Sequence, residues 1–566
     1  MADVIHFKKT LLQTRHFLCS MCLKIRRVPM KQFFYNAKIR TMDGMRIAEN
    51  MLVENGRIQA LDCDVDTCVN DPDCSASDLG GRVVLPGFHD SHQHFLCYAI
   101  DKEKIDFYNA KSVQQMADMT KEYIEKRRIP KGEWIQGGGW NENFFDIKKV
   151  PTRQQLDDMA PDHPLIFTRA CCSTAVANTA ALKLAGIFDN PPHMEDGEIV
   201  VDEHGVPTGL LNERARFHIY DIIPKISKDE IKQLILDYQE DLLKAGLTTV
   251  QTDDFKMWDA TFQDILQAYK ELEEHNLLKV RFIQQLRLVD HEQLDAYLDL
   301  GIEPYEGTDM FRVGTFKLLP DGSLGGKTAA LLEPYEGDAH NRGILTYSRE
   351  QLYSLLEKAH VNGLQLAMHA IGDGASDLVL SCYEELQNKY PRQDPRFRII
   401  HCQITNEDIL NRFAKQNVIA DIQPLFIKAD MEVAEELIGK ERLSTSYNWK
   451  TMLNKGIHIS GSSDAPVESF DPRLGIYCAV TSKNLEGHPP GGWMPEQRLS
   501  RQEAVSLYTS FPAYTCYEEN YKGMLKEGYL ADFIVMPEDI MTVPEMDIQT
   551  LEIDEAWIGG EKMYSV

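Results

Sequence analysis

The chain has 566 residues, of which 43% are hydrophobic, and it carries a formal net charge of −27. This length allows more than one domain. The negative charge argues against nucleic acid or an anionic membrane surface as a partner, and it would attract a basic or neutral substrate more readily than a polyanion. The sequence contains no run of 18 apolar residues, so we expect no transmembrane helix. The 12 cysteines show no paired framework, which favours a reduced, cytoplasmic setting.

The two ends of the chain are rich in short strands and turns. Residues 1–29 are basic, and we read them either as an extension of unknown role or, preferably, as a leader that precedes the folded part. Residues 30–84 contain Asn55-Gly56 between alternating apolar flanks, which is a hairpin signal. Residues 518–566 have the same character. We therefore expect one small sheet domain built from both ends.

The middle of the chain, residues 85–517, alternates strand and helix patterns. One helix is predicted to begin at an N-cap, Ser348, and to end at Gly363. Eight short apolar runs lie at residues 83–92, 247–253, 280–286, 311–319, 364–372, 397–404, 418–424 and 457–466. Eight strands with intervening helices are typical of an α/β fold, the (β/α)8 TIM barrel. The first two runs are so far apart that we expect an insertion at about residues 96–240, suited to substrate selection.

Good metal ligands, or a lysine, recur at the predicted strand ends, where TIM barrels place their catalytic residues. The six residues are His92, His94, Lys317, His369, His401 and Asp464. His92 and His94 alternate on one strand and share a face, whereas His89 has the opposite parity and should pack away from the site. The HxH pair alone is weak evidence, because 17 histidines make a chance pair common.

The other four residues also have plainer explanations. His369 and His401 would singly be read as hydrogen-bonded core histidines, and Asp464 as a turn-capping aspartate. Lys317 either extends its amine to the barrel mouth or is buried with a lowered pKa. A neutral lysine amine can react with carbon dioxide to give a carbamate able to bridge two metals. Together, four histidines and one carboxylate on separate strand ends fit divalent zinc.

These residues lie in segments that resemble the amidohydrolase superfamily and, within it, the amidohydrolase-3 group, which includes N-substituted formamide deformylases. PGFHDSHQH resembles the group's PGxxDxHxH, and GTFKLLPDGSLGGKTAALLEPY resembles its lysine strand. MHAIGDGA, IIHCQI and GSSDAP resemble its motifs on strands five, six and eight, and YKGMLKEGYLADFIVM resembles its C-terminal sheet segment. The motifs keep the group's order and cover nearly the whole chain from about Met30.

The resemblance implies a TIM barrel with a small β-sandwich formed by residues 30–84 and 518–566. It implies one or two Zn2+ ions held by the six strand-end residues, with carboxylated Lys317 as the bridging ligand. It also implies a small-molecule substrate, and it suggests a homodimer.

Four further residues are candidates for substrate contact. Trp140 lies in an aromatic-rich part of the insertion, although such aromatics are more often core. Ser173 stands five residues before Asn-x-Ala-Ala-Leu, where the group often has a histidine, so substrate contact would differ here. Glu213 matches a recurrent acidic position, for either substrate contact or a structural ion pair. Asp321 follows the lysine strand.

The predicted activity is metal-dependent hydrolysis of a C–N bond of the amide or N-substituted formamide type. The metal would lower the pKa of a bound water toward ~7, and Asp464 would act as general base and then as general acid. One alternative is a single-metal deaminase or cyclic-amide hydrolase on the same fold, with Lys317 unmodified. Another is a non-catalytic ligand-binding barrel, against which the complete set of ligands argues.

Overall fold

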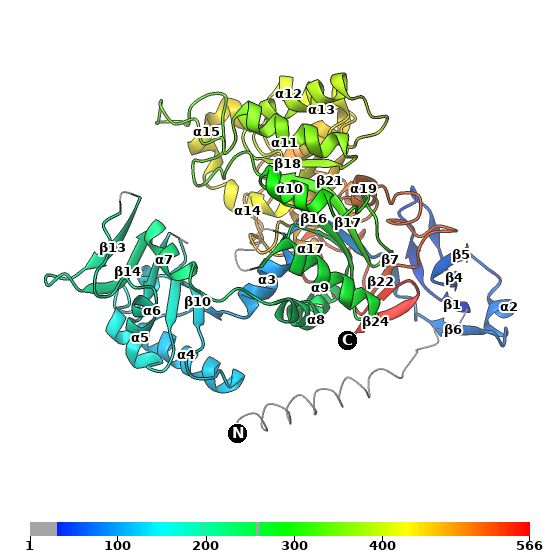
Figure 1. Cartoon of the computed structure of the whole chain (residues 1–566). Coiled ribbons are helices and arrows are strands. Elements are labelled where there is room, and N and C mark those ends of the chain that lie inside the picture. Colours follow the sequence, from blue (N-terminus) through cyan, green and yellow to red (C-terminus); the bar gives the residue numbers. More distant parts are fainter. Residues whose placement is uncertain (1–30, 172, 195, 256–259) are drawn as a thin grey trace. The chain divides into compact units, whose positions relative to one another are not determined.

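The computed structural model describes residues 31–171, 173–194, 196–255 and 260–566 (Figure 1). The basic segment 1–29 lies outside these residues. The chain divides into two compact units. The first comprises the described part of Met1–Gln93 together with Gln239–Asp253 and Asn276–Val566, and the second comprises His94–Tyr238 and Asp254–His275.

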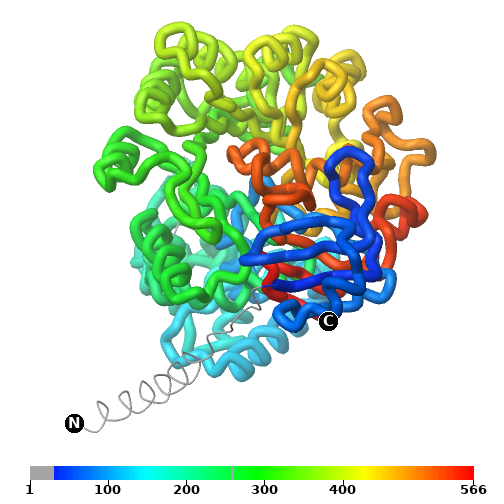
Figure 2. The backbone as a smooth tube through the Cα atoms, turned by 90° about the vertical axis from the view of Figure 1, so that its right-hand side faces the viewer, coloured from blue at the N-terminus to red at the C-terminus, as the bar shows by residue number. Residues whose placement is uncertain are grey.

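Two sheets of the first unit bring both ends of the chain together, and their blue and red strands lie side by side in Figure 2. One sheet, in the order β5-β4-β1-β6, contains β1 (Lys31–Tyr35), β4 (Met51–Glu54), β5 (Arg57–Leu61) and β6 (Cys74–Asp78). The other, in the order β24-β23-β22-β7-β2-β3, contains β2 (Lys38–Arg40), β3 (Ile47–Ala48), β7 (Val83–Pro86), β22 (Phe533–Met536), β23 (Glu555–Ile558) and β24 (Glu561–Ser565).

Local sequence explains how these two sheets form and join. Asn55 and Gly56 have φ angles of 52° and 75°, which the tight turn between β4 and β5 requires. Phe34 of the first sheet packs edge-on against Phe533 and Trp557 of the second. This aromatic cluster is fully or nearly fully buried, so it holds the two sheets together.

Eight parallel strands of the first unit form the predicted barrel, in the order β21-β20-β19-β18-β17-β16-β15-β8. They are β8 (Phe88–Gln93), β15 (Leu247–Thr252), β16 (Arg281–Leu286), β17 (Phe311–Leu318), β18 (Leu366–Ala370), β19 (Arg398–His401), β20 (Ile419–Ile422) and β21 (Ile459–Gly461). The Ser91 hydroxyl donates to the Gly461 carbonyl at 3.0 Å, and this bond joins the first strand to the last. The prediction of a (β/α)8 barrel is confirmed.

Helices connect the strands, as expected for parallel neighbours. Ser348 caps one of them through a capping box with Gln351, as its sequence predicts, and the chain turns at Gly363 with a φ of 83°. The helices that lie in the first unit or enter it are α2 (Val65–Val69), α8 (Lys228–Lys244), α10 (His291–Leu298), α11 (Arg349–Val361), α12 (Asp373–Lys389), α13 (Glu407–Gln416), α14 (Ile427–Asp430), α15 (Ala434–Leu443), α16 (Trp449–Asn454), α17 (Pro472–Thr481), α18 (Arg501–Ser506) and α19 (Ser510–Thr515).

The barrel interior contains a buried charge pair. Arg398, the first residue of β19, donates from Nε to Asp421 of β20 at 2.7 Å, and both side chains have no exposed surface. The same guanidinium donates to the side-chain oxygen of Gln251 at 2.7 Å and to the Ser91 carbonyl at 2.9 Å. His401, at the other end of β19, lies at the carboxyl ends of the strands, where a site is expected.

The second unit has its own sheet, in the order β13-β14-β12-β11-β10-β9. Its strands are β9 (Ile105–Asp106), β10 (Ile135–Trp140), β11 (Leu165–Arg169), β12 (Thr174–Ala177), β13 (Gly197–Val201) and β14 (Pro207–Glu213). Its helices are α3 (Phe95–Lys102), α4 (Val113–Arg127), α5 (Arg153–Met159), α6 (Thr179–Leu184), α7 (Phe217–Tyr220) and α9 (Phe262–Glu274). No helix in the described part of the chain is long and apolar enough to cross a membrane.

Candidate metal centre

Three of the predicted ligands converge at the carboxyl ends of the barrel strands. His92 lies on β8, His401 ends β19, and Asp464 follows β21. One ligand atom from each residue lies within 4.8 Å of the other two, and all three residues are buried. Nε2 of His92 is 3.2 Å from Oδ1 of Asp464. The spacing and the donor types suit one divalent ion with nitrogen and oxygen ligands.

Two glutamines determine which nitrogen each histidine presents. Nδ1 of His92 is 2.8 Å from Oε1 of Gln285, and Nδ1 of His401 is 2.8 Å from Oε1 of Gln423. The amide nitrogen of Gln285 donates to the Ser91 carbonyl, which fixes the amide orientation and makes Oε1 an acceptor. Both histidines therefore carry the proton on Nδ1, so that Nε2 keeps a lone pair for a metal.

Two of the three converging residues have unusual backbone conformations. Asp464 has a φ of 58° and His401 a φ of 84°, in a region that side-chain-bearing residues seldom adopt. The backbone N–H of Asp464 donates to the His92 carbonyl at 2.9 Å, which ties the loop after β21 to the first strand. Such strain is retained where the surrounding structure enforces it, and it often marks functional sites.

Lys317 of β17 lies beside this group. Its amine is 3.3 Å from Nε2 of His92, and the residue is 1% exposed. Burial lowers the pKa of Lys317 to about 8. Burial, together with the neighbouring His369, holds the pKa of His401 well below its ordinary value, so that this imidazole is neutral and able to bind a metal.

His369 of β18 lies against His401 but is turned toward a carboxylate. The two rings are 4.3 Å apart, and Nε2 of His369 is 3.2 Å from Oδ1 of Asp321. Asp321 also accepts hydrogen bonds from the backbone N–H groups of Ala330, Ile371 and Gly372. These contacts place Asp321 as a support for His369, and its predicted contact with substrate stays a prediction.

The remaining histidines near β8 have different surroundings. His94 begins the second unit as the N-cap residue of α3, and its role as a ligand stays a prediction. His89 contacts Gln251 and lies near Cys516 and Glu518, apart from the His92 group. Because Lys522 pairs with Glu518, a cation already occupies that second cluster, and we read His89 as packed.

The family assignment follows from comparison with known proteins. The model of the amidohydrolase family matches residues 76–564. The chain belongs to this family. This chain is 33% identical to the Bacillus subtilis protein YtcJ, which is named as an amidohydrolase. The match covers 94% of this chain and 99% of that protein. It is 26% identical to the N-substituted formamide deformylase of Arthrobacter pascens, over 94% and 97% of the two chains.

A solved structure agrees with this assignment. The structure of an uncharacterized metal-dependent hydrolase from Pyrococcus furiosus matches with a TM-score of 0.76 and 28% identity, covering 90% of this chain and 100% of that one. The resemblance inferred from the motifs is confirmed, and membership of the family supports a hydrolase.

The three predicted substrate residues of the second unit have distinct environments. Trp140 is fully buried, and its indole N–H donates to the Phe167 carbonyl at 2.9 Å, as in the alternative reading of a core aromatic. The hydroxyl of Ser173 is 3.3 Å from Sγ of Cys171, and its carbonyl accepts from the N–H of Glu213. The side chain of Glu213 is exposed, and the described residues give it no ion pair. Substrate contact by these three residues stays a prediction.

Sequence reasoning missed several side chains around the centre of this amidohydrolase-family chain. Gln285 and Gln423 support the histidines, and Arg287 and Asp253 follow the neighbouring strands β16 and β15. The half-buried ring of Phe426 lies 6.1 Å from that of His401, nearly parallel to it. One signal in the sequence could have found the polar residues among these, because they stand at or just after the last positions of otherwise apolar strands.

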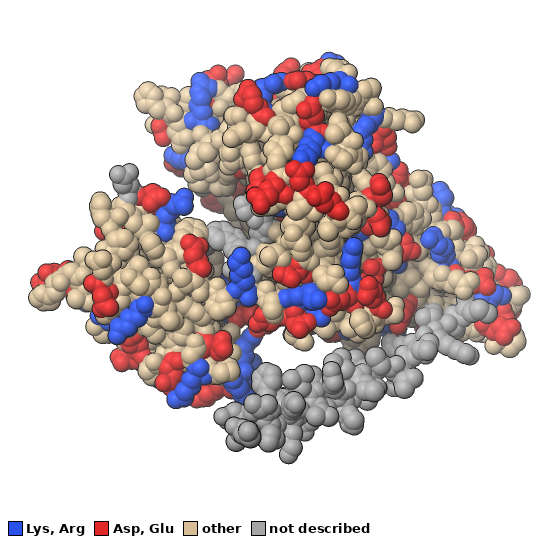
Figure 3. Space-filling model, in the orientation of Figure 1, with Lys and Arg blue, Asp and Glu red and all other residues tan. Residues whose placement is uncertain are grey.

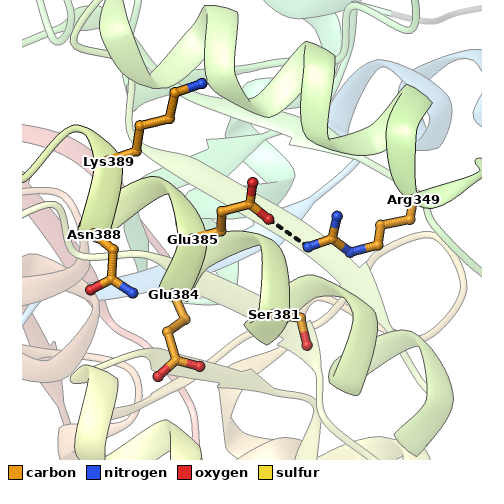
Figure 4. Close-up of a pocket in the computed structure, with 6 residues that line it drawn as sticks. All are labelled: Arg349, Ser381, Glu384, Glu385, Asn388 and Lys389. Atoms are coloured by element: carbon orange, nitrogen blue, oxygen red, sulfur yellow. Dashed lines mark hydrogen bonds and ion pairs between the residues drawn. The ribbon is translucent and has the colours of Figure 1, made fainter.

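A separate surface hollow of about 460 Å³ lies on α11 and α12 (Figure 4). It is lined by Arg349, Ser381, Glu384, Glu385, Asn388 and Lys389. An ion pair of 2.5 Å between Arg349 and Glu385 crosses it. None of the predicted site residues lines this hollow, so we do not connect it with the chemistry.

Proposed function

We propose that this chain is a metal-dependent amidohydrolase that cleaves a C–N bond of a small amide or N-substituted formamide. The observation that carries the proposal is the convergence of His92, His401 and Asp464 at the carboxyl ends of the barrel strands. The names of the relatives, an amidohydrolase and a formamide deformylase, support the same class of bond.

The residues present fit a divalent metal such as Zn2+. His92 and His401 offer neutral imidazole nitrogens whose partners fix the tautomer, and Asp464 offers a carboxylate. We propose His94 and His369 as additional ligands. When bound, the metal would polarise the scissile carbonyl and lower the pKa of a water molecule.

We propose that Lys317 is carboxylated and bridges two metal ions. In this reaction the neutral amine nitrogen bonds the carbon of carbon dioxide and releases one proton, which leaves an anionic carbamate. The buried position and the pKa of about 8 support it, because part of the lysine population is then neutral near pH 7–8. The 3.3 Å contact with His92 places the amine beside a predicted ligand.

Asp464 is the proposed proton carrier. Its carboxylate would take a proton from the attacking water and deliver it to the leaving nitrogen as the C–N bond breaks, giving a carboxylic acid and an amine. The hydrogen bond from its backbone N–H to the His92 carbonyl and its strained backbone hold the carboxylate beside the centre. A fixed base of this kind contributes about 10²–10⁴-fold to the rate.

A second candidate is a single-metal deaminase or cyclic-amide hydrolase with unmodified Lys317. It is favoured by the three-residue group itself, which suits one ion, and by the contact of His369 Nε2 with Asp321. Metal stoichiometry and the mass of peptides that contain Lys317 distinguish the two candidates, because only the first requires two metal ions and a carbamate on Lys317.

The proposal is tested by metal analysis of the purified full chain with an activity screen on N-formyl amines, N-acyl amines and cyclic imides. We expect tightly bound zinc and hydrolysis of at least one amide or formamide. Turnover of cyclic imides alone would favour the second candidate. A chain with no tightly bound metal and no hydrolysis would instead be a non-catalytic ligand-binding barrel.

A further inference from the structure

Arg287 stands at the mouth of the barrel beside the candidate centre. It directly follows β16, two residues after Gln285, whose side chain reaches the ring of His92. Alternate residues of a strand share a face, so Arg287 lies on the same side of the sheet, one step nearer the carboxyl ends. Its charge also lowers the pKa of Lys317, which agrees with this placement.

The guanidinium of Arg287 is poorly satisfied by the protein. Among the described residues, the carboxylate within ion-pair distance is that of Asp253, whose Oδ2 is 3.9 Å from an Arg287 terminal nitrogen. This distance is too long for a hydrogen bond. Nε of Arg287 is buried, and no acceptor in the described part of the chain bonds it. A buried donor without an acceptor is unfavourable, so the protein alone leaves this guanidinium incompletely satisfied.

The side chain of Arg287 is 24% exposed, so part of it remains accessible to an external anion. A guanidinium presents parallel N–H groups that match the two oxygens of a carboxylate. Lys428 of α14, which follows β20, differs because it is paired with Glu468 at 2.6 Å. The half-buried ring of Phe426 next to His401 adds an apolar surface near the centre.

We propose that Arg287 binds a carboxylate of the substrate, so that the site takes N-formyl or N-acyl amino acids with an apolar side chain rather than neutral amides. This inference rests on the proposed function and names its substrate class. The specificity comes from a local contact between Arg287 and the carboxylate next to the amide that is cleaved.

The net charge of −27 would by itself disfavour an anionic substrate. On the face drawn in Figure 3, however, Lys and Arg are interspersed with Asp and Glu. Surface charges are screened over about 8 Å at physiological ionic strength. A partly buried guanidinium in direct contact with its ligand is screened much less, so the local contact decides the preference.

The test compares N-formylphenylalanine with N-formylphenethylamine, which differ only by the carboxylate. For the zinc-loaded full chain, we expect kcat/KM to be about 10- to 100-fold higher for the carboxylate compound. Arg287→Met should remove this preference, so that kcat/KM becomes equal for the two compounds, while Arg287→Lys should keep part of it. Arg349→Met, which removes a surface arginine from α11, is the matched control and should keep the full preference.

Equal kcat/KM for the two compounds in the wild type, or an equal loss on both in Arg287→Met with unchanged zinc content and melting temperature, would overturn the inference. If the wild type hydrolyses neither compound, the proposed function fails only when the wider activity screen also shows no hydrolysis. Calorimetric titration of 3-phenylpropanoate onto the zinc-loaded protein then decides the role of Arg287. Saturable binding that Arg287→Met weakens at least tenfold supports it, and binding that is absent or unchanged rejects it.

Discussion

Gln423 accepts a hydrogen bond from Nδ1 of His401 at 2.8 Å, and it does so with a neutral amide oxygen. The amide nitrogen of Gln423 in turn donates to the Ser462 hydroxyl at 2.8 Å, so the side chain is held from both ends. Gln285 supports His92 in the same way. Because the supporting groups are amides rather than carboxylates, they orient the imidazoles without adding negative charge beside the metal.

Gln423→Leu should weaken zinc binding by about 10- to 100-fold, because Nδ1 of His401 loses its acceptor and the ring its orientation. Competition with a chromophoric chelator measures this affinity. Gln423→Glu, which keeps an acceptor at the same reach, should bind zinc at least as tightly as wild type. Wild-type zinc affinity in the leucine variant would show that Gln423 does not position the ligand.

Asp464→Asn should separate metal binding from turnover. The amide keeps an oxygen beside His92 but cannot take a proton, so we expect zinc to be largely retained and kcat to fall by at least about 10²-fold. Zinc content and kcat are measured on the same preparation. A variant that turns over at close to the wild-type rate would remove Asp464 from the role of proton carrier.

Lys317→Ala should lose metal, because the proposed bridging carbamate is then absent. A short carboxylate such as acetate or propionate, added at millimolar concentration, should restore part of the metal content and of the activity. Full metal occupancy in the alanine variant without added carboxylate would contradict the bridging role and favour the single-metal alternative.

Much of the fold could be predicted because the barrel strands are buried on both faces. They therefore appear in the sequence as short apolar runs between turn signals, and all eight were found. The extent of the second unit was less accessible. It includes Asp254–His275 with helix α9, a segment that reads locally like any barrel helix, and only contacts within the folded chain reveal where it belongs.

The candidate site, like the fold, could be predicted from the sequence only in part. His92, His401 and Asp464 could be named because strand ends converge in a barrel. The glutamines that support these histidines could not be predicted. Gln285 lies 193 residues from the histidine that it contacts, and a glutamine in a strand has no sequence signature of its own. For the same reason, the orientation of His369 toward Asp321 required the structure.

Arg398 and Asp421 should be strongly interdependent. Asp421→Asn leaves an uncompensated guanidinium in the barrel interior and should lower the free energy of unfolding by about 3–5 kcal/mol. The double variant Arg398→Met with Asp421→Asn should lose less than the sum of the two single variants. Chemical denaturation of the four proteins measures this coupling, and strictly additive losses would contradict it.

Asp430, the last residue of α14, should make stability depend on pH. Burial raises the pKa of Asp430 to about 6, although Tyr447 and Gln403 both donate to its Oδ2. Below about pH 4 both the folded and unfolded states hold the proton, so the group adds no penalty. As the pH rises from about 4 to 6, the unfolded state releases its proton before the folded state does. The folded state therefore loses stability until the carboxyl group is ionised in both states.

Asp430→Asn removes this penalty and keeps an oxygen that can accept the same two hydrogen bonds. The variant should therefore be more stable than wild type, and this difference in the free energy of unfolding should be about 1–2 kcal/mol larger at pH 8 than at pH 5. Denaturant unfolding of both proteins at the two pH values measures the difference, in which the titration of all other groups cancels. Asp408→Asn, an exposed aspartate on α13, is the control and should show no such change. A variant whose stability relative to wild type is the same at both pH values would show that Asp430 does not titrate in this range.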